Sequence, residues 1–127
     1  MLLDNIEDKE LKALMDKLRI RTKGVLLLRK SLYFYSLGLE TLPNALFDLT
    51  HIERLDLSRN KFTELPDGIG KLSNLKHLDL QFNALTKLPD SLFNLRKLSV
   101  LNLRGNSINQ HLINRYKFIL PNCEIRV

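Results

Sequence analysis

The stretch Ile52–Asn74, IERLDLSRNKFTELPDGIGKLSN, is followed directly by Leu75–Lys97, LKHLDLQFNALTKLPDSLFNLRK. The two segments have the same length and share Leu, Asp, Leu, Asn, Thr, Leu, Pro, Asp and Leu at matching positions. Self-similarity at a fixed period of roughly 20–50 residues is typical of solenoids, in which copies of one supersecondary unit stack on each other. The pair therefore decides the fold class.

The same register extends in both directions. Counting back one period gives residues 29–51, RKSLYFYSLGLETLPNALFDLTH, with Leu and Phe at the apolar positions of the repeat. Counting forward gives LSVLNLRGNSI at the start of a partial repeat. We therefore predict four repeats, at residues 29–51, 52–74, 75–97 and 98–109.

Within each repeat, alternate leucines predict a short strand with one buried side. Asparagines follow the strands at Asn60, Asn83 and Asn106. The amide of an asparagine can both accept and donate, so it can pair backbone groups in a turn that would otherwise be buried without partners. The Leu-Pro pair that follows excludes a strand, because proline has a fixed φ and no N–H. We interpret the three asparagines as structural.

The open ends of a stack need covering. Residues 4–20 have helical spacing of apolar residues, with Asp4 and Glu7 as a capping pair and Gly24 as the stop. The apolar run Val25–Leu28 fits a buried strand or a second helical stretch equally well. We predict that residues 1–28 form an N-terminal helical cap.

The other end loses the Leu-Pro turn after Ile108. QHLINRYKFIL takes its place with apolar residues near one face of a helix, and PNCEIRV then alternates like a short strand. We predict a helix–strand cap at residues 110–127 and one structural domain overall.

Residues 29–121 resemble the 23-residue leucine-rich repeats with the pattern LxxLxLxxNxLxxLPxxLxxL, which occur in bacterial proteins and effectors and in Ras-associated scaffold proteins. The resemblance implies an α/β solenoid with a short parallel sheet on its concave face. It also implies a non-catalytic protein-interaction role as an adaptor, regulator or effector. In this superfamily, ligase and kinase activities lie in separate domains, so we expect no enzyme activity.

The compartment is inferred from the cysteine count and the first residues. Cys123 is the only cysteine, so no internal disulfide forms, which favours a reducing environment. The start MLLDNIEDKE has acids where a secretory signal needs basic and then apolar residues, and no apolar run is long enough to span a bilayer. We expect a cytoplasmic protein, with non-classical secretion as an open route.

Side chains of the strands that are not used for the core should face the concave side. Aligned by the period, they form rows across neighbouring strands, and three aromatic residues are among them. Aromatic and arginine side chains are enriched where binding energy concentrates. The predicted partner-binding residues are Tyr33, Tyr35, Arg54, Asp56, Arg59, His77, Asp79, Gln81, Phe82, Asn102 and Arg104.

Asp56 and Asp79 fall in one row, where their repulsion would be relieved by a cation or by a Lys or Arg of a partner. Aspartate is also a common filler at this repeat position. His77 beside them is too generic a set to specify a metal, so we expect no metal and no cofactor. We expect a monomer that binds another protein.

The formal net charge of +6 is concentrated at the front, since residues 17–39 hold six Lys and Arg and no acid. This favours an alternative in which the basic segment 17–30 binds nucleic acid or an anionic membrane surface. The segment has no interleaved aromatic residue for stacking on bases, so a solvated cap face is the preferred interpretation. The protein-binding hypothesis and this alternative differ in their dependence on salt.

Overall fold

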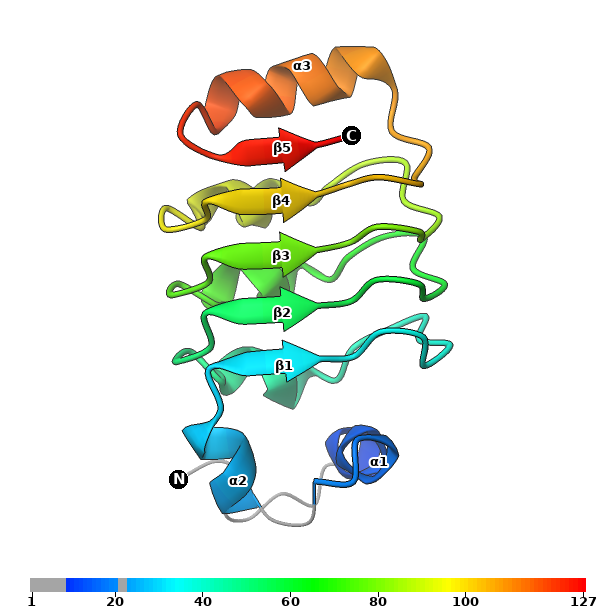
Figure 1. The fold of residues 1–127 in the computed structure, drawn as a ribbon, viewed down its shortest axis with the longest axis vertical. Helices are drawn as coiled ribbons and strands as arrows, with labels where there is room; N and C mark the ends of the chain where they lie inside the picture. Colours follow the sequence, from blue (N-terminus) through cyan, green and yellow to red (C-terminus); the bar gives the residue numbers. More distant parts are fainter. Residues whose placement is uncertain (1–8, 21–22) are drawn as a thin grey trace.

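A computed structural model describes residues 9–20 and 23–127. Five short parallel strands lie side by side in chain order, and each pairs with the next (Figure 1). They are β1 (Ser31–Tyr33), β2 (Arg54–Asp56), β3 (His77–Asp79), β4 (Val100–Asn102) and β5 (Glu124–Arg126). The predicted α/β solenoid with a parallel sheet is confirmed.

The strand pairing follows the sequence period. Leu32 is level with Leu55, Leu55 with Leu78, and Leu78 with Leu101. A shift by one residue would turn every leucine to the other face of the sheet, so the buried row fixes the register.

The opposite side of each of the first three repeats is one short 3₁₀ helix. These are η2 (Asn44–Asp48), η3 (Asp67–Lys71) and η4 (Asp90–Asn94). Each follows a proline of the Leu-Pro pair, which has φ between −65° and −68° and an extended ψ. Proline fixes this φ without strain and has no N–H to leave unpaired, so it suits the start of a helical turn.

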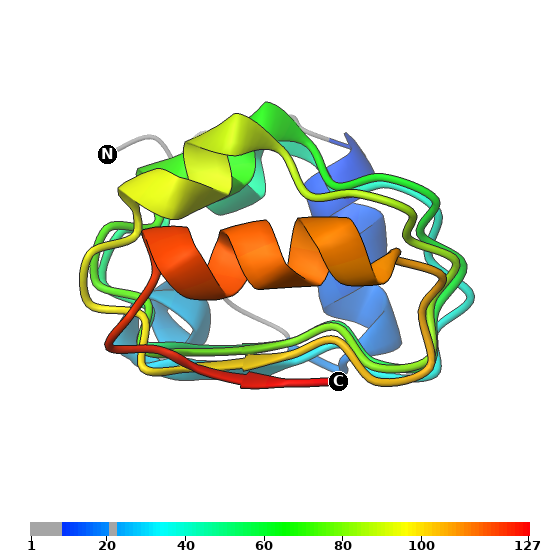
Figure 2. The ribbon, with the colours of Figure 1, turned by 90° about the horizontal axis from the view of Figure 1, so that it is seen from above.

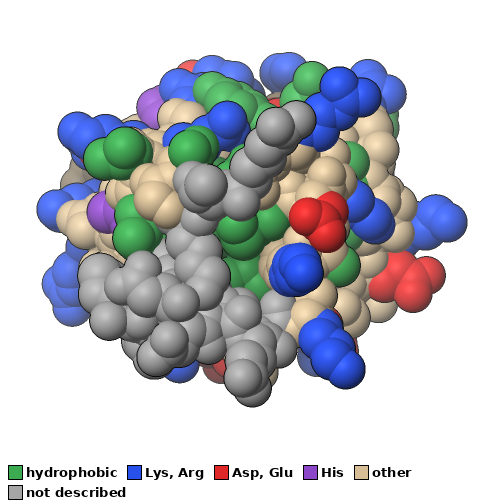
Figure 3. Space-filling model, turned by 90° about the horizontal axis from the view of Figure 1, so that it is seen from below, with side chains coloured by type: hydrophobic (Ala, Val, Ile, Leu, Met, Phe, Trp, Pro, Cys, Tyr) green, Lys and Arg blue, Asp and Glu red, His purple; other side chains and the backbone are tan. Residues whose placement is uncertain are grey.

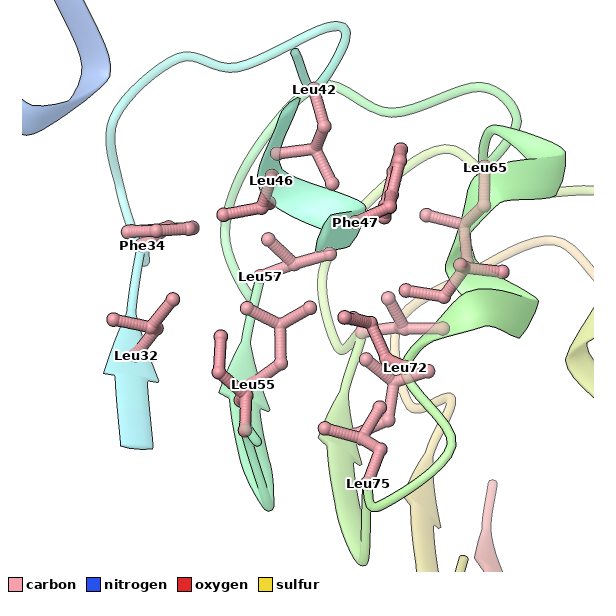
Figure 4. Close-up of a cluster of buried hydrophobic side chains, with 14 of the residues drawn as sticks. Leu32, Phe34, Leu42, Leu46, Phe47, Leu55, Leu57, Leu65, Leu72 and Leu75 are labelled. Carbon is pink, nitrogen blue, oxygen red and sulfur yellow. The ribbon is translucent and has the colours of Figure 1, made fainter. Parts of the chain in front are cut away.

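The core lies between the sheet and the 3₁₀ helices. Figure 4 shows Leu55 of β2 and the nearby Leu57 in one cluster with Leu46 of η2 and Leu72, which follows η3. These four side chains are at most 1% exposed. Burying a leucine fully contributes about 1.5–3 kcal/mol, and each repeat achieves this only by stacking on its neighbours.

The asparagines after the strands bond the repeats to each other. The Asn60 side-chain oxygen accepts the N–H groups of Leu37 and Leu39, both at 3.0 Å. Its amide nitrogen donates to the carbonyl oxygens of Phe34 at 2.8 Å and Leu57 at 2.9 Å. Asn83 and Asn106 make the same kinds of bonds one and two repeats later. Buried backbone groups of each turn are thereby paired.

At the N-terminal end, α1 (Lys9–Lys17) and α2 (Lys23–Leu28) lie below β1 (Figure 1). The expected stop at Gly24 is wrong, because Gly24 lies inside α2. The first helix ends instead at Lys17 and is capped by Arg19, which has φ of +56°, and the N–H of Ile20 bonds back to the carbonyl of Met15 at 2.9 Å. This is the hydrogen-bond pattern of a left-handed C-terminal cap, which glycine usually occupies.

The two interpretations of Val25–Leu28 are decided in favour of helix. Only Leu26 is fully buried, whereas Leu28 is 85% exposed. The predicted capping pair Asp4 and Glu7 lies outside the described residues.

At the C-terminal end, α3 (Gln110–Ile119) lies across the top of the stack (Figure 2). Asn109 caps it, since its side chain accepts the N–H of Leu112 at 2.9 Å. The Tyr116 hydroxyl is buried and accepts the N–H of Leu88 at 3.0 Å. This bond joins the helix to the last complete repeat. In the final strand Ile125 packs against the core, but Val127, which lies beyond the strand, is 57% exposed.

Candidate functional site: the outer face of the sheet

The strands present their remaining side chains on the outer face of the sheet, which we call the sheet face. Strand pairing sets Arg54 level with His77, and Asp56 level with Asp79. Asp79 is in turn level with Asn102. These are the neighbours that the sequence period predicts.

The fifth strand adds two residues to this face that the sequence analysis missed. Glu124 continues the row of His77 and Val100, and Arg126 continues the row of Asp79 and Asn102. The alternation in the tail indicated a strand, but its sequence does not follow the 23-residue period. Its register on β4 therefore had no sequence signal.

Three aromatic side chains on this face are about half exposed. Tyr33 is 47% exposed, Tyr35 is 54% exposed and Phe82 is 47% exposed. Phenylalanines of the repeats that face inward, such as Phe34 and Phe62, are at most 1% exposed. Within the repeats, the sheet face and its margin therefore carry exposed aromatic side chains, and outside the repeats Phe118 of α3 is exposed as well.

Phe82 occupies an uncommon backbone conformation, with φ of +56°. The residue before the asparagine position has a positive φ in every repeat, namely Ser36, Arg59, Phe82 and Gly105. A left-handed conformation costs most side chains about 1–2 kcal/mol. Phe82 is held there between neighbours: the Arg59 guanidinium lies 4.8 Å from the centre of its ring, and Gly105 provides the space beside it. The Arg59 contact is a cation–π interaction.

The middle of the sheet face is hollowed. The hollow has a volume of about 220 Å³ and mixes aromatic, basic and acidic side chains. Its lining comes from all five strands and comprises Tyr33, Arg54, Leu55, Asp56, His77, Leu78, Asp79, Val100, Asn102 and Arg126.

The two aspartates of the hollow have a local structural role as well. The Asp56 carboxylate accepts the N–H of Ser58 at 2.9 Å, and that of Asp79 accepts the N–H of Gln81 at 3.0 Å. The Gln81 side chain also donates to Asp79, at 3.3 Å. Asn102 repeats the pattern by accepting the N–H of Arg104. Short polar side chains commonly bond the backbone two residues ahead.

Burial shapes the electrostatics of the hollow. It raises the pKa of Asp79, and repulsion from Asp56 acts in the same direction against the hydrogen bonds from Gln81. Burial also lowers the pKa of His77, helped by the positive charges of Arg54, Arg126 and Lys76. At neutral pH the imidazole is therefore uncharged.

The remaining predicted residues differ in accessibility. Arg54, Arg59 and Arg104 are exposed, and Gln81 is half-buried. Asn102 is only 7% exposed, so it offers a partner far less surface than an open strand position would.

The Cys123 thiol and the acidic side chains give little support to a nucleophilic or metal-binding role. Burial raises the pKa of the Cys123 thiol to about 11, with a further contribution from Glu124, so the thiol is protonated at neutral pH. Among residues 9–20 and 23–127, no cluster of three or more His, Cys, Asp or Glu side chains has the arrangement of a metal site.

The basic residues of segment 17–30 have different neighbours. Lys17 donates to the carbonyl of Leu37, and Lys30 lies 3.6 Å from the Glu53 carboxylate. Arg21 lies outside the described residues. In the view from below, Lys and Arg side chains are spread around the rim of the described part of this face, with hydrophobic side chains between them (Figure 3).

Comparison with known proteins supports the architecture. Residues 50–108 match the family model for leucine-rich repeats. A leucine-rich repeat protein of Leptospira interrogans is similar, with 36% identity and a TM-score of 0.74 over 77% of this chain. This chain spans only 25% of the length of that protein.

A second solved structure shares the fold at low identity. It is that of the Chaetomium Mex67:Mtr2 subunits, with 21% identity and a TM-score of 0.56, covering 91% of this chain and 88% of the other. No curated protein sequence matches significantly. None of the helices among the described residues is long and apolar enough to cross a membrane.

The repeat period, the parallel sheet, the family-model match and the matches to solved structures all indicate the same fold. The chain is a leucine-rich repeat protein, of a family whose fold is generally non-catalytic and typically binds other proteins.

Proposed function

We propose that this chain binds a protein partner through the sheet face, as an adaptor, regulator or effector without catalytic activity of its own. The observation that carries the proposal is the exposure of Tyr33, Tyr35 and Phe82, each 47–54% accessible on a sheet whose leucines are buried. Tyrosine, tryptophan and arginine dominate binding energy in protein interfaces.

The side chain at Phe82 supports the same conclusion. The positive φ recurs at the equivalent position of every repeat, where Ser36, Arg59 and Gly105 stand, and of these four only Phe82 places a large apolar ring there. A large apolar side chain in a left-handed conformation adds nothing to the buried core. Stacked against Arg59, it presents a firm apolar surface to a partner.

The size of the face indicates a moderate affinity. Five strands spaced about 4.8 Å apart form a narrow platform, smaller than the roughly 800 Å² per partner of a standard interface. We therefore expect a tight partner to contact the margin near Phe82 as well as the strands.

The experiment is affinity capture from native cell lysate with wild type and a Tyr33→Ala/Tyr35→Ala/Phe82→Ala variant. The matched control is Phe118→Ala, which removes an 86% exposed aromatic from α3. We expect a protein to be retained by wild type and the control but depleted about tenfold or more by the triple variant, at an unchanged melting temperature. Equal recovery by all three would contradict the proposal.

The nucleic-acid or membrane alternative through segment 17–30 gives a different result. Phosphate contacts lose affinity steeply between about 50 and 200 mM salt, because counterions are released on binding. An interaction centred on aromatics should weaken little over that range. Recovery that is abolished by nuclease or by 200 mM salt, and kept by the aromatic variant, would favour the alternative.

A further inference from the structure

The sheet face continues for two residues beyond the C-terminal ends of β1 to β4, at the arrowheads in Figure 1. Neighbouring repeats stay bonded there. The N–H of Arg59 donates to the carbonyl of Gln81 at 2.9 Å, and the N–H of Phe82 donates to that of Arg104 at 2.8 Å. We call this strip the margin, and it is formed by residues 35–36, 58–59, 81–82 and 104–105. Because its backbone is paired like that of the strands, its side chains start from fixed positions.

The margin is uniformly basic. It holds Arg59 and Arg104 and no acid, and both arginines are exposed. Within residues 9–20 and 23–127, neither guanidinium has a carboxylate oxygen within 4.0 Å. The aspartates of the sheet face, Asp56 and Asp79, lie in the hollow and each accept a backbone N–H. The margin therefore presents two positive charges that no carboxylate of the described chain neutralises.

The Phe82 ring holds one of these charges in place. The Arg59 guanidinium lies 4.8 Å from the ring centre, and Gly105 lies so close to the ring that an added Cβ would overlap it. A guanidinium stacked on an aromatic face keeps N–H groups at its edge for other partners. Its planar fork is already oriented, so less entropy is lost when it bonds both oxygens of a carboxylate.

Aromatic and basic side chains alternate along the margin. In chain order the first repeat supplies Tyr35, the second Arg59, the third Phe82 and the fourth Arg104. Tyr35 and Phe82 are about half exposed. A peptide segment that crosses the repeats would therefore meet apolar and positively charged surface in turn.

We propose that the margin binds a short acidic segment of the protein partner, with carboxylates at Arg59 and Arg104 and an apolar side chain against Phe82. The two arginines are two strands apart, which is about 10 Å at the usual strand spacing. A polyproline II segment places residues three apart on one side at about 9 Å, so two acids separated by two residues fit the pair. This inference rests on the proposed function and names the chemistry of the partner.

A nucleic-acid strand fits this surface less well. Its phosphates recur at every nucleotide, whereas the margin offers two arginines only. The hollow beside the margin contains Asp56 and Asp79, whose charges repel phosphates. A short acidic segment confined to the margin avoids that repulsion.

The direct test uses a small probe and requires no identified partner. ¹⁵N-labelled protein is titrated with acetyl-Glu-Pro-Leu-Glu-amide at low salt, where exposed charges are least screened, and followed by NMR. The matched probe, acetyl-Gln-Pro-Leu-Gln-amide, has nearly the same shape and no charge. We expect saturable shifts at the backbone amides of Arg59, Phe82 and Arg104 and at the Arg59 Nε–H. The affinity for the glutamine probe should be at least about fivefold weaker.

Matched variants test the site. Arg59→Gln/Arg104→Gln should abolish the response at an unchanged melting temperature, because both side chains are exposed. Arg96→Gln/Arg115→Gln removes two exposed arginines elsewhere and should leave the response unchanged.

Several results would overturn the proposal. These are equal affinity for the two probes, shifts located away from the margin, and shifts that persist in Arg59→Gln/Arg104→Gln. Tighter binding of a short oligothymidylate at the same amides would overturn it as well, in favour of a nucleic-acid ligand.

The partner captured from lysate separates this inference from the proposed function. If Arg59→Gln/Arg104→Gln loses the partner as the triple aromatic variant does, both stand. If only the aromatic variant loses it, the acidic anchor is wrong and the sheet-face proposal holds. If only the arginine variant loses it, the acidic anchor stands and the aromatic side chains do not carry the binding. If neither loses it, the interface lies elsewhere and both proposals fail.

Discussion

At the scale of single residues, three asparagines join the repeats. Each places its amide where the strand turns away from the sheet, and bonds backbone groups both of its own repeat and of the one before. An amide can do this because it donates and accepts at once. The backbone turns below the sheet face therefore keep one shape from repeat to repeat.

Asn83→Ala should lower the free energy of unfolding by about 1–3 kcal/mol, because the N–H of Phe62 loses its acceptor. The carbonyls of Leu57 and Leu80 each lose one of two donors and keep the bonds from Asn60 and Asn106. Urea unfolding measures the change. Asn94→Ala, at an exposed position, should stay within about 0.5 kcal/mol of wild type. Asn83→Asp should also destabilise the fold, since the carboxylate keeps the acceptor but loses both donors. A stable Asn83→Asp protein would contradict the role of the donors.

Asp79→Asn should keep or raise the melting temperature at pH 7. Burial raises the pKa of Asp79, so its ionised form opposes folding. That penalty is fully present above the raised pKa and disappears as the pH falls toward the ordinary value of 3.8. The advantage of the variant should therefore narrow as the pH is lowered in thermal melts. A lower melting temperature at pH 7 would show that the carboxylate stabilises the fold.

Gly105→Ala should destabilise the fold, because Gly105 has φ of +72° and an added Cβ would overlap the Phe82 ring. In a Phe82→Ala background only the backbone strain remains, so the same substitution should cost less. A double-mutant cycle by urea unfolding measures the coupling, which we expect to be about 0.5–3 kcal/mol. Additive effects would show that Gly105 and Phe82 do not constrain each other.

At the scale of elements, no strand or outer helix is stable alone. The strands have three residues each and the 3₁₀ helices five. Elements this short depend on tertiary packing, so the caps are as necessary as the repeats. At the C-terminal end this dependence is concentrated in α3, which buries Ile113 and Tyr116 against the stack.

Tyr116→Phe should cost about 1–3 kcal/mol, since the N–H of Leu88 would remain buried without its acceptor. The aromatic ring and its contact with Phe93, at 5.2 Å between ring centres, are kept. Hydrogen exchange should show faster exchange at Leu88 and in α3. Wild-type protection of Leu88 in the variant would contradict the role of the hydroxyl.

At the scale of the whole molecule, the described chain has one continuous core. Buried apolar residues run without a break from Leu11 in α1 to Tyr116 in α3. A stack of few repeats coupled by such a core is expected to unfold as a unit. The sheet face is therefore expected to stay folded as one platform.

Leu78→Ala in the central strand should cost about 2–5 kcal/mol, because Leu78 is only 1% exposed and its removal leaves a cavity. Far-UV circular dichroism reports the whole chain, while tyrosine fluorescence includes the buried Tyr116 in the C-terminal cap. Both transitions should shift together. Separate transitions would show that the cap unfolds independently of the repeats.

The sequence by itself determined the period, the strand register, the inward leucines and the positions of the three asparagines. These features repeat every 23 residues, so each copy supports the assignment of the others. The rows containing Arg54, Asp56, His77 and Asp79 followed from the same count.

Only the tertiary structure decided how the two ends of the stack are capped and how deeply the side chains of the sheet face are buried. Val25–Leu28 has no readable period, the first helix is capped by Arg19 rather than by a glycine, and Arg126 reaches the hollow from a strand outside the repeat. The near-complete burial of Asn102 likewise depends on its surroundings in the folded chain. The physical reason is common to all of them: the outcome is set by contacts between segments distant in sequence, which a local pattern does not encode.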